Sequence, residues 1–552
     1  MAVSADAPKM KPTLGLTGVT VNAMALIAPG AFLWITFVVQ AGYAFPSGFA
    51  MWAGILAALT LSFATAVSYS ELAKLYPGAG SSYFFAEQAF LSKTHAYRFA
   101  RIAKFTVGWA AHLYYWVYPG AMVATMGIMI GYIVGTVFPS ELNSAIPGPV
   151  FMALAAVIFA YGVSYIAYRG VVGSTMVNVA INAIQIVALL FFSALAISHR
   201  LGHPEGSMGM ALDGSMQKLT YSLVGDHPAH SSAWSVMAPH AFNSMMLQAT
   251  IAIFLLVGFE SVTSLGEEAK NAKRDIPRAV ILSLVIQGLF CYLVEYFAAN
   301  YFMSSAYSLN DAKASAAPIG DMMVIIGNVM LGGHGQSFML IEAFTVFLAL
   351  IGTTLSCINT GARVTYAMGR DEEVPEHFGM LHGDNLTPHR AIWTLATISA
   401  VLGAFAAIYF FAGASAPDDK TIATLPHDIW YSFGMSSNAS LAAMPNGLAL
   451  VTLLSNFGTF AVYGLTNIIA IVAFREHHAF HGIKHMVIPV YGALANFACM
   501  AFYIIGPVEG LGSVKEPLIA VGLSLAWGIY GAIYFVRSSK KKGKTTLVAK
   551  IA

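Results

Sequence analysis

Long apolar stretches alternate with shorter polar segments along most of this chain. Windows of about 20 apolar residues, enough helix to cross roughly 30 Å of hydrocarbon, can be placed twelve times. The pattern predicts spans over residues 17–40, 49–74, 105–136, 148–168, 174–198, 243–267, 279–303, 337–366, 391–413, 447–474, 485–506 and 516–537. We therefore expect an all-α polytopic membrane protein with 12 transmembrane helices.

The amino-acid composition is typical of a membrane protein and argues against several kinds of partner. Of 552 residues, 57% are hydrophobic and only 10% are charged, whereas soluble domains carry about 25% charge. The net charge of +2 is spread along the chain, so we expect no nucleic-acid partner. The three cysteines all fall in apolar runs, and the histidines lack the spacing of a metal site. We accordingly predict no disulfide framework, no metal and no cofactor.

The basic residues predict an orientation in the lipid bilayer. With a cytoplasmic amino terminus, 23 of the 28 Lys and Arg residues fall in inner segments. The five exceptions are Arg200, Lys218, Lys313, Lys420 and Lys515. This asymmetry predicts a multi-pass protein of the cell (plasma) membrane with both termini in the cytoplasm.

The sixth predicted span carries an unusual charge. Its apolar run continues into Val257-Gly-Phe-Glu260 before a charged tail begins at Glu267. An ionisable group inside a membrane span costs roughly 2.5–3.5 kcal/mol on insertion scales, so Glu260 marks a candidate functional site. The alternative interpretation places Glu260 near a helix end, in contact with water.

The first predicted span has an interruption at a similar depth. Pro29-Gly30 lies in mid-membrane, as Gly258 does in span 6, and both are positions where a helix can open. The two positions lie five spans apart, and an odd repeat unit of five spans predicts two halves of opposite topology. We expect the units 1–16 (cytoplasmic tail), 17–198 (first repeat), 199–242 (extracellular loop), 243–474 (second repeat), 475–537 (two further helices) and 538–552 (basic cytoplasmic tail).

Two open helices facing one cavity favour a particular kind of ligand. The half-helix that begins near Pro29 would point its free amides at an anion such as a carboxylate. The half-helix that ends near Val257 would leave carbonyl groups from Phe254 onward, which suit an ammonium group. The natural ligand is therefore a zwitterionic amino acid or a small amine.

Several motifs resemble those of the amino acid–polyamine–organocation superfamily of permeases. The stretch Val257-Gly-Phe-Glu260 with Glu267–Pro277 is similar to the family's span-6 signature and inner loop. Residues 365–375 and 76–83 resemble the segments after spans 8 and 2. The resemblance covers about residues 14–540 and implies the LeuT-like five-plus-five inverted repeat with broken helices 1 and 6 and two extra helices.

The resemblance also implies which residues bind substrate. Residues Ile27, Ala28, Pro29, Gly30 and Ala31 match the stretch that holds the substrate carboxylate, with Pro29 where the family usually has Ser. Phe254 matches an aromatic lid, Val257 and Gly258 match positions whose carbonyls meet the amino group, and Glu260 matches an acidic residue implicated in proton sensing.

Coupling has more than one candidate. Gln185 falls where some proton-coupled relatives have Lys, and a neutral amide cannot carry the proton, so Glu260 or Glu295 would have to titrate. Ser356 and Asn359 are candidate oxygen ligands for sodium, and His112 is a candidate to line the cavity. Polar residues such as Ser356 and Asn359 more often form hydrogen bonds between helices, and the aromatic residues beside His112 also suit anchoring at the membrane interface.

We therefore expect a secondary active transporter and not an enzyme. It would move an amino acid or related small amine by alternating access, either with protons or in exchange for a counter-substrate. A sodium-coupled symporter of the same fold and a non-transporting nutrient sensor are the alternatives. The sequence contains neither His-Glu-x-x-His nor a suitably placed Gly-x-Ser-x-Gly motif. Oligomeric state is not predicted.

Overall fold

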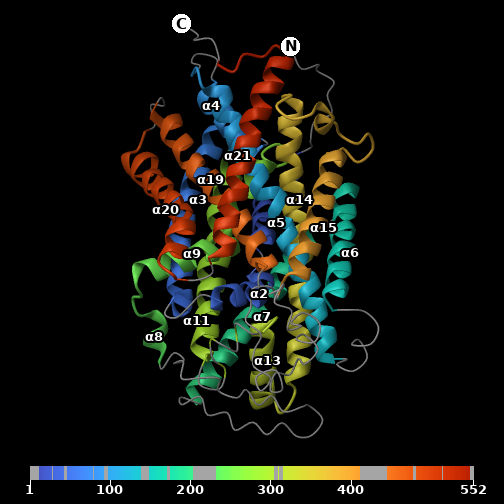
Figure 1. The fold of residues 1–552 in the computed structure, drawn as a ribbon, viewed down its shortest axis with the longest axis vertical. Helices are drawn as coiled ribbons and strands as arrows, with labels where there is room; N and C mark the ends of the chain where they lie inside the picture. Colours follow the sequence, from blue (N-terminus) through green and yellow to red (C-terminus); the bar gives the residue numbers. More distant parts are fainter. Residues whose placement is uncertain are drawn as a thin grey trace.

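The computed structural model describes residues 12–27, 29–42, 47–78, 80–91, 97–137, 148–170, 175–202, 232–303, 307, 309, 312, 315–410, 444–475, 480–511 and 514–547. These residues form a bundle of helices, most of which run along the long axis of the molecule (Figure 1). Apart from helices, the described residues form one isolated parallel β-bridge, between Leu14 and Ala269. The all-helical prediction is confirmed.

Eleven helices of the described chain are long and apolar enough to cross a membrane. These spans are Gly48–Leu75, Ala100–Val134, Gly148–Arg169, Val179–Gly202, Phe242–Leu265, Ala272–Phe302, Gly335–Arg370, His389–Ile408, Gly447–Arg475, Ile483–Val508 and Lys515–Lys541. Twelve were predicted. The difference lies in the first predicted span, which forms two shorter helices, α1 (Leu16–Ile27) and α2 (Pro29–Ala41).

The named elements follow the chain in this order. They are α3 (Met51–Leu75), α4 (Ser81–Phe90), α5 (Ala100–Val137), α6 (Gly148–Arg169), α7 (Thr175–Gly202), α8 (Ala233–Met237), α9 (Phe242–Leu256), the 3₁₀ helix η3 (Phe259–Leu265), α10 (Ala272–Ser283), the π-helix η4 (Leu284–Tyr292), α11 (Leu293–Phe302), α13 (Pro318–Met330), α14 (Gly335–Arg370), α15 (His389–Ile408), α19 (Gly447–Arg475), α20 (Ile488–Val508) and α21 (Lys515–Lys541).

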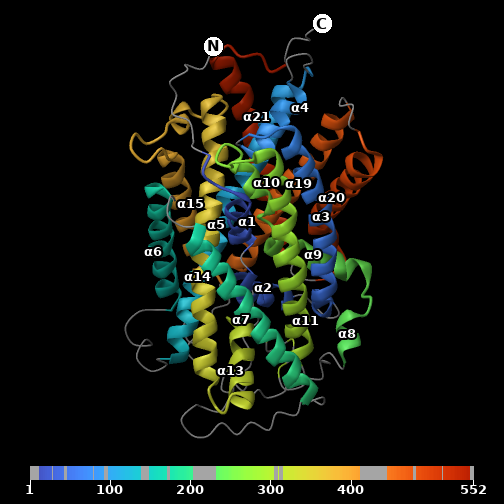
Figure 2. The same ribbon diagram turned by 180° about the vertical axis from the view of Figure 1, so that it is seen from behind.

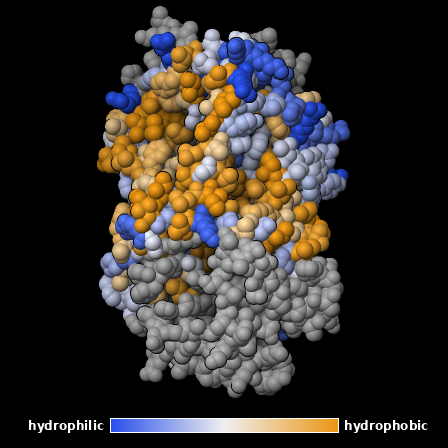
Figure 3. All heavy atoms as spheres, in the orientation of Figure 1, coloured by the Kyte–Doolittle hydropathy of each residue, from blue (hydrophilic) through white to orange (hydrophobic). Residues whose placement is uncertain are grey.

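Apolar side chains face outward around the middle of the bundle. Ile158 on α6, Val187 on α7 and Leu494 on α20 are each more than 60% exposed. Apolar surface also forms the broad middle of the face in Figure 3, while hydrophilic residues gather mainly towards the end where α4 and the end of α21 lie. This distribution suits a bundle whose sides contact lipid and whose end near α4 contacts water.

Helix α5 lies at the centre, and α21 is fastened to it by two tryptophans. The α5 helix packs against α14, α15 and α19. The ring of Trp109 on α5 stacks on that of Trp527 at 4.4 Å between centroids. Each indole N–H donates to the backbone carbonyl of the other residue, at 2.9 and 3.1 Å. Gly531 allows this contact, because a Cβ there would lie 2.2 Å from the Trp109 nitrogen.

The far end of the bundle, opposite α4, contains α13 (Figures 1 and 2). The pattern of residues 317–327 favours an amphipathic helix, with either a position across the outer mouth or a plain surface position. The structure buries most of it against α2, α7 and α14. Asp321 explains part of this burial, because it accepts hydrogen bonds from Tyr132 at 2.8 Å and Tyr307 at 3.1 Å.

Candidate functional site

The first break separates α1, which ends at Ile27, from α2, which begins at Pro29. The last carbonyls of a helix lack partners inside it, and here two side chains from distant helices supply them. Tyr292 donates to the Ile27 carbonyl at 2.7 Å, and Thr353 donates to the Ala25 carbonyl at 2.8 Å. Tyr292 ends the π-helical segment η4, a form that often occurs at functional positions.

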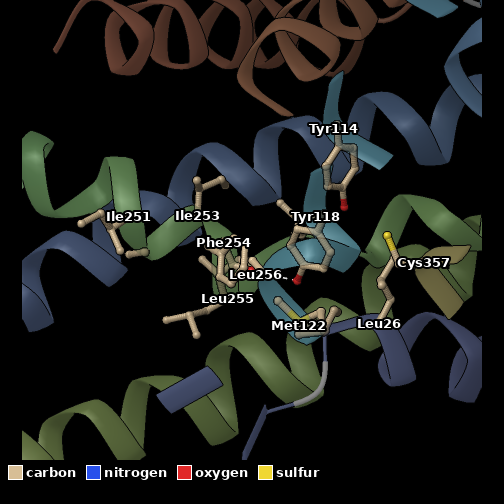
Figure 4. Close-up of a cluster of buried hydrophobic side chains, with 14 of the residues drawn as sticks. Leu26, Tyr114, Tyr118, Met122, Ile251, Ile253, Phe254, Leu255, Leu256 and Cys357 are labelled. Atoms are coloured by element: carbon tan, nitrogen blue, oxygen red, sulfur yellow. Dashed lines mark hydrogen bonds between the residues drawn. The ribbon is translucent and has the colours of Figure 1, made fainter. Parts of the chain in front are cut away.

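The second break separates α9 from η3. Helix α9 ends at Leu256, Val257 is extended with ψ 148°, and Gly258 has φ +126°. The carbonyl of Phe254 accepts a hydrogen bond from Tyr118 of α5 at 3.1 Å, and the two rings lie 4.7 Å apart. Figure 4 shows Tyr114, Tyr118 and Met122 along α5, beside the end of α9.

The two breaks touch each other at Gly258. A Cβ on this residue would lie 2.8 Å from the Cβ of Leu26 and 3.0 Å from the backbone nitrogen of Ile27. Glycine is therefore required twice, first because φ is in the left-handed region and second because the end of α1 approaches so closely. The pairing of interruptions that the sequence predicts thus corresponds to direct contact in space.

Glu260 lies two residues beyond this contact and is fully buried. Its Oε1 accepts from the hydroxyls of Tyr114 and Tyr115, each at 3.1 Å. Its Oε2 accepts from Tyr463 of α19 at 2.6 Å and from the Gly258 N–H at 2.9 Å. The alternative of a helix end in water is thereby excluded.

Four donors on one carboxylate suit its ionised form. An ionised carboxylate has about four acceptor positions and no donor, so Glu260 is saturated as it stands. A proton on Oε2 would compete with Tyr463 and with the Gly258 amide for the same lone pairs. Protonation of Glu260 would therefore act directly on the backbone of the second break.

The remaining residues expected to bind substrate are placed as follows. Phe254 and Val257 are buried at the second break, and Ile27 is buried at the first. Ala28 lies outside the described residues, and Pro29, Gly30 and Ala31 are described only by their helical backbone. The N–H groups of Gly30 and Ala31 belong to the first turn of α2, where backbone donors lack helical partners, while Pro29 has no N–H.

The other candidates for coupling do not gather around Glu260 in the contacts that the structure describes. His112 faces Thr365 at 3.3 Å and stacks on Trp116, on the side of α5 towards α21. Gln185 is buried on α7, and Glu295 is fully buried on α11. Neither Gln185 Oε1 nor either Glu295 oxygen has a hydrogen-bond partner within the described residues.

Ser356 and Asn359 are half-buried on α14, one to two turns beyond Thr353. Thr353, which the sequence did not single out, is a residue of this helix that donates a hydrogen bond to the end of α1. Tyr292 and Tyr463 were also missed. A tyrosine in an apolar run does not reveal which distant carbonyl or carboxylate it meets. Among the described residues, no group of three His, Cys, Asp or Glu is placed to hold a metal ion.

The short helix α4 packs against η3, on the side of Glu260 towards the chain termini (Figure 1). Thr263 Oγ1 lies 2.9 Å from Ser81 Oγ, and a Cβ on Gly266 would lie 2.4 Å from the Gly78 carbonyl. The following loop is held by an ion pair of 2.7 Å between Glu268 and Arg363 of α14. Tyr83 of α4 donates to Asp371 at 2.9 Å; burial raises the pKa of this phenol well above its ordinary value, and the negative charge of Asp371 acts in the same direction.

Substitution of Gly258 tests the contact between the breaks. Gly258→Ala should lower the thermal stability of the detergent-solubilised protein and abolish uptake, because a left-handed φ alone costs a side chain about 1–3 kcal/mol. Gly352→Ala on α14 is the matched control, since its Cβ would meet nothing nearer than Ala25 at 3.9 Å. A Gly258→Ala protein that melts and transports like the parent would contradict this account of the break.

Comparisons with known proteins agree with this geometry. The chain is similar to a branched-chain amino acid permease of Bacillus subtilis, with 26% identity over 73% of this chain and 77% of that protein. It is also similar to a low-affinity putrescine importer of Escherichia coli K12, with 25% identity over 96% and 94% of the two chains.

A similar solved structure is that of MhsT in complex with L-phenylalanine, with a TM-score of 0.54 and 14% identity over 90% of this chain and all of that one. This likeness supports the LeuT-like fold expected from the motifs. The family model described as "Amino acid permease" matches residues 13–531. The chain therefore belongs to the amino acid permease family, within the amino acid–polyamine–organocation superfamily.

Proposed function

We propose that this permease binds its substrate where the two broken helices meet and carries it by alternating access. The contact of Gly258 with the end of α1, directly beside the saturated carboxylate of Glu260, is the observation that carries the proposal. Unwound backbone inside a membrane bundle is tolerated where it lines a cavity or is buried in protein, and paired half-helices are the usual site of transport.

The backbone suits an α-amino acid. In the proposed complex, the amides of Gly30 and Ala31 receive the carboxylate at the positive end of the α2 dipole. The carbonyls at the end of α9 receive the ammonium group. The carbonyl of Phe254 is already held by Tyr118, so we assign this role to residues 255–257.

The surrounding side chains favour an apolar substrate over a diamine. Leu26, Met122, Leu256 and Cys357 are buried around the breaks (Figure 4). Glu260 already accepts four hydrogen bonds, so it has no free position for a second ammonium group. An amino acid with an apolar side chain is therefore the first candidate, and putrescine is the second because a putrescine importer is among the relatives.

Glu260 is the proposed proton-coupling group. A proton on this carboxylate would displace a donor from Tyr463 or from Gly258, and so would loosen the break that the substrate contacts. The basic residues support an orientation with both termini in the cytoplasm, which would put α4 at the inner end. The division into repeats at 17–198 and 243–474 is part of the same proposal.

Uptake into proteoliposomes tests this function. The purified protein should accumulate at least one labelled apolar amino acid when a proton gradient or an internal counter-substrate is supplied. Sodium, proton and counter-substrate gradients are imposed separately, with putrescine in the same panel and empty liposomes as the control. Absence of uptake for every compound under every gradient would contradict transport, and a requirement for sodium would contradict coupling through protons.

Neutralising Glu260 tests its role in coupling. Glu260→Gln keeps the shape of the side chain but removes its charge and replaces one acceptor oxygen by an NH2 donor, as permanent protonation would. It should therefore flatten the dependence of uptake on pH, and its folding is checked by thermal stability in detergent. The measurement is the initial rate of uptake as a function of pH, followed on both sides of neutrality. An unchanged profile in Glu260→Gln with a flattened one in Glu295→Gln would assign coupling to Glu295 instead.

A further inference from the structure

The segment that follows α21 is tied to the loop after α14. Lys544 lies 2.8 Å from the Glu372 carboxylate and donates to the Asp371 carbonyl at 3.0 Å. Lys542 donates to the Glu372 carbonyl at 3.0 Å. The carbonyl of Thr545 accepts from Arg101 of α5 at 2.9 Å. We call residues 542–545 the tail clasp.

The loop that the clasp holds is itself bound to α5. Arg101 makes a two-pronged ion pair with Glu373, at 2.7 and 2.9 Å. Lys104 is buried between Asp371 at 2.5 Å and Glu87 of α4 at 2.8 Å. Arg101 therefore contacts both the tail and the loop, while Lys104 joins the loop to α4.

Helix α4 completes the connection to the second broken helix. Ser81 meets Thr263 of η3, and Thr263 donates to the backbone carbonyl of Glu260 at 2.6 Å. Ser82 lies 2.8 Å from Thr466 of α19. Polar contacts thus join the tail to the loop and the loop to α4, and further contacts join α4 to the backbone carbonyl of Glu260.

We propose that the tail clasp is a regulatory latch that stabilises the closed arrangement of α4 against η3. This inference rests on the proposed alternating access, since opening on this side requires η3 and α4 to separate. Ion pairs at a water-facing end are individually weak, but several of them share the residues of one loop, which makes their release cooperative. Release of Lys542 and Lys544 would then favour opening at the end where the tail lies.

The charges of the latch respond to salt more than to physiological pH. The hydrogen bond and charge of Lys544 hold the pKa of Glu372 below its ordinary value. The stabilisation from the Glu372–Lys544 pair is therefore fully present above the pKa that Glu372 has in the unfolded chain. It is lost only as the pH falls through the lower pKa that Glu372 has in the folded protein. Screening reaches exposed pairs directly, because the Debye length falls to about 3 Å at 1 M salt.

The neighbouring lysines supply a matched control. Lys540 and Lys541 lie at the end of α21 and are exposed, whereas Lys542 and Lys544 are half-buried against the loop. The pairs Lys542→Gln with Lys544→Gln and Lys540→Gln with Lys541→Gln remove the same charge from the same segment. A difference between them therefore reports the contacts of the clasp and not the general positive charge of the tail.

The reporter is a cysteine at Leu265, which is buried at the end of η3. Leu265→Cys is made in the full chain with Cys291, Cys357 and Cys499 replaced by serine, and is labelled with a membrane-impermeant maleimide from the side that carries the tail. Neutralising Lys542 and Lys544 should accelerate labelling about threefold to tenfold, and the control pair should stay within about twofold of the parent. High salt should accelerate the parent but not the Lys542/Lys544 variant.

Equal labelling rates for the two pairs would overturn the latch. A charge exchange distinguishes loss of the ion pair from general unfolding. Lys544→Glu should accelerate labelling, and adding Glu372→Lys to this variant should restore the parental rate. Failure of this restoration would also contradict the proposal. Uptake by the parent protein is measured separately, so loss of the latch effect with intact uptake would leave the proposed transport function in place.

Discussion

The hydrogen bonding of Glu260 is the constraint on which the centre of this protein depends. A carboxylate without partners inside a membrane bundle would cost several kcal/mol, so its acceptor positions must be filled by donors within the protein. Tyr114, Tyr115 and Tyr463 fill three of them, and the amide of Gly258 fills the fourth. The requirement fixes α5, α19 and the second break relative to one another.

The same tyrosine-rich centre also holds the carbonyls of the broken helices. Tyr118 donates to the carbonyl of Phe254, and Tyr292 donates to the carbonyl of Ile27. Each break is therefore stabilised by a hydroxyl from a different helix. Hydroxyl groups on packed helices can exchange one partner for another with small movements. Such a centre is well suited to a carrier, which must change between two arrangements without exposing free backbone to lipid.

Local features of the sequence were sufficient to predict the broken helices. Pro29-Gly30 and Gly258 interrupt apolar runs by properties of their own backbone, and Glu260 is conspicuous because charge is rare in a span. Partners from distant helices could not be predicted in this way. His112 and Tyr115 are three residues apart on α5, yet only Tyr115 contacts Glu260, and Tyr463 reaches it from 203 residues away. Helix packing decides such contacts. In a helix surrounded by protein and lipid, the apolar periodicity of the sequence does not show which face meets which partner.

The most direct test of the central claim is a structure of the full chain determined with the transported substrate from the uptake panel bound at saturating concentration. We expect ligand density between the start of α2 and residues 255–258, with the carboxylate against the amides of Gly30 and Ala31. We also expect that Glu260 keeps its tyrosine partners and makes no contact with the ligand. A substrate bound elsewhere in the bundle, or paired directly with Glu260, would contradict the central claim.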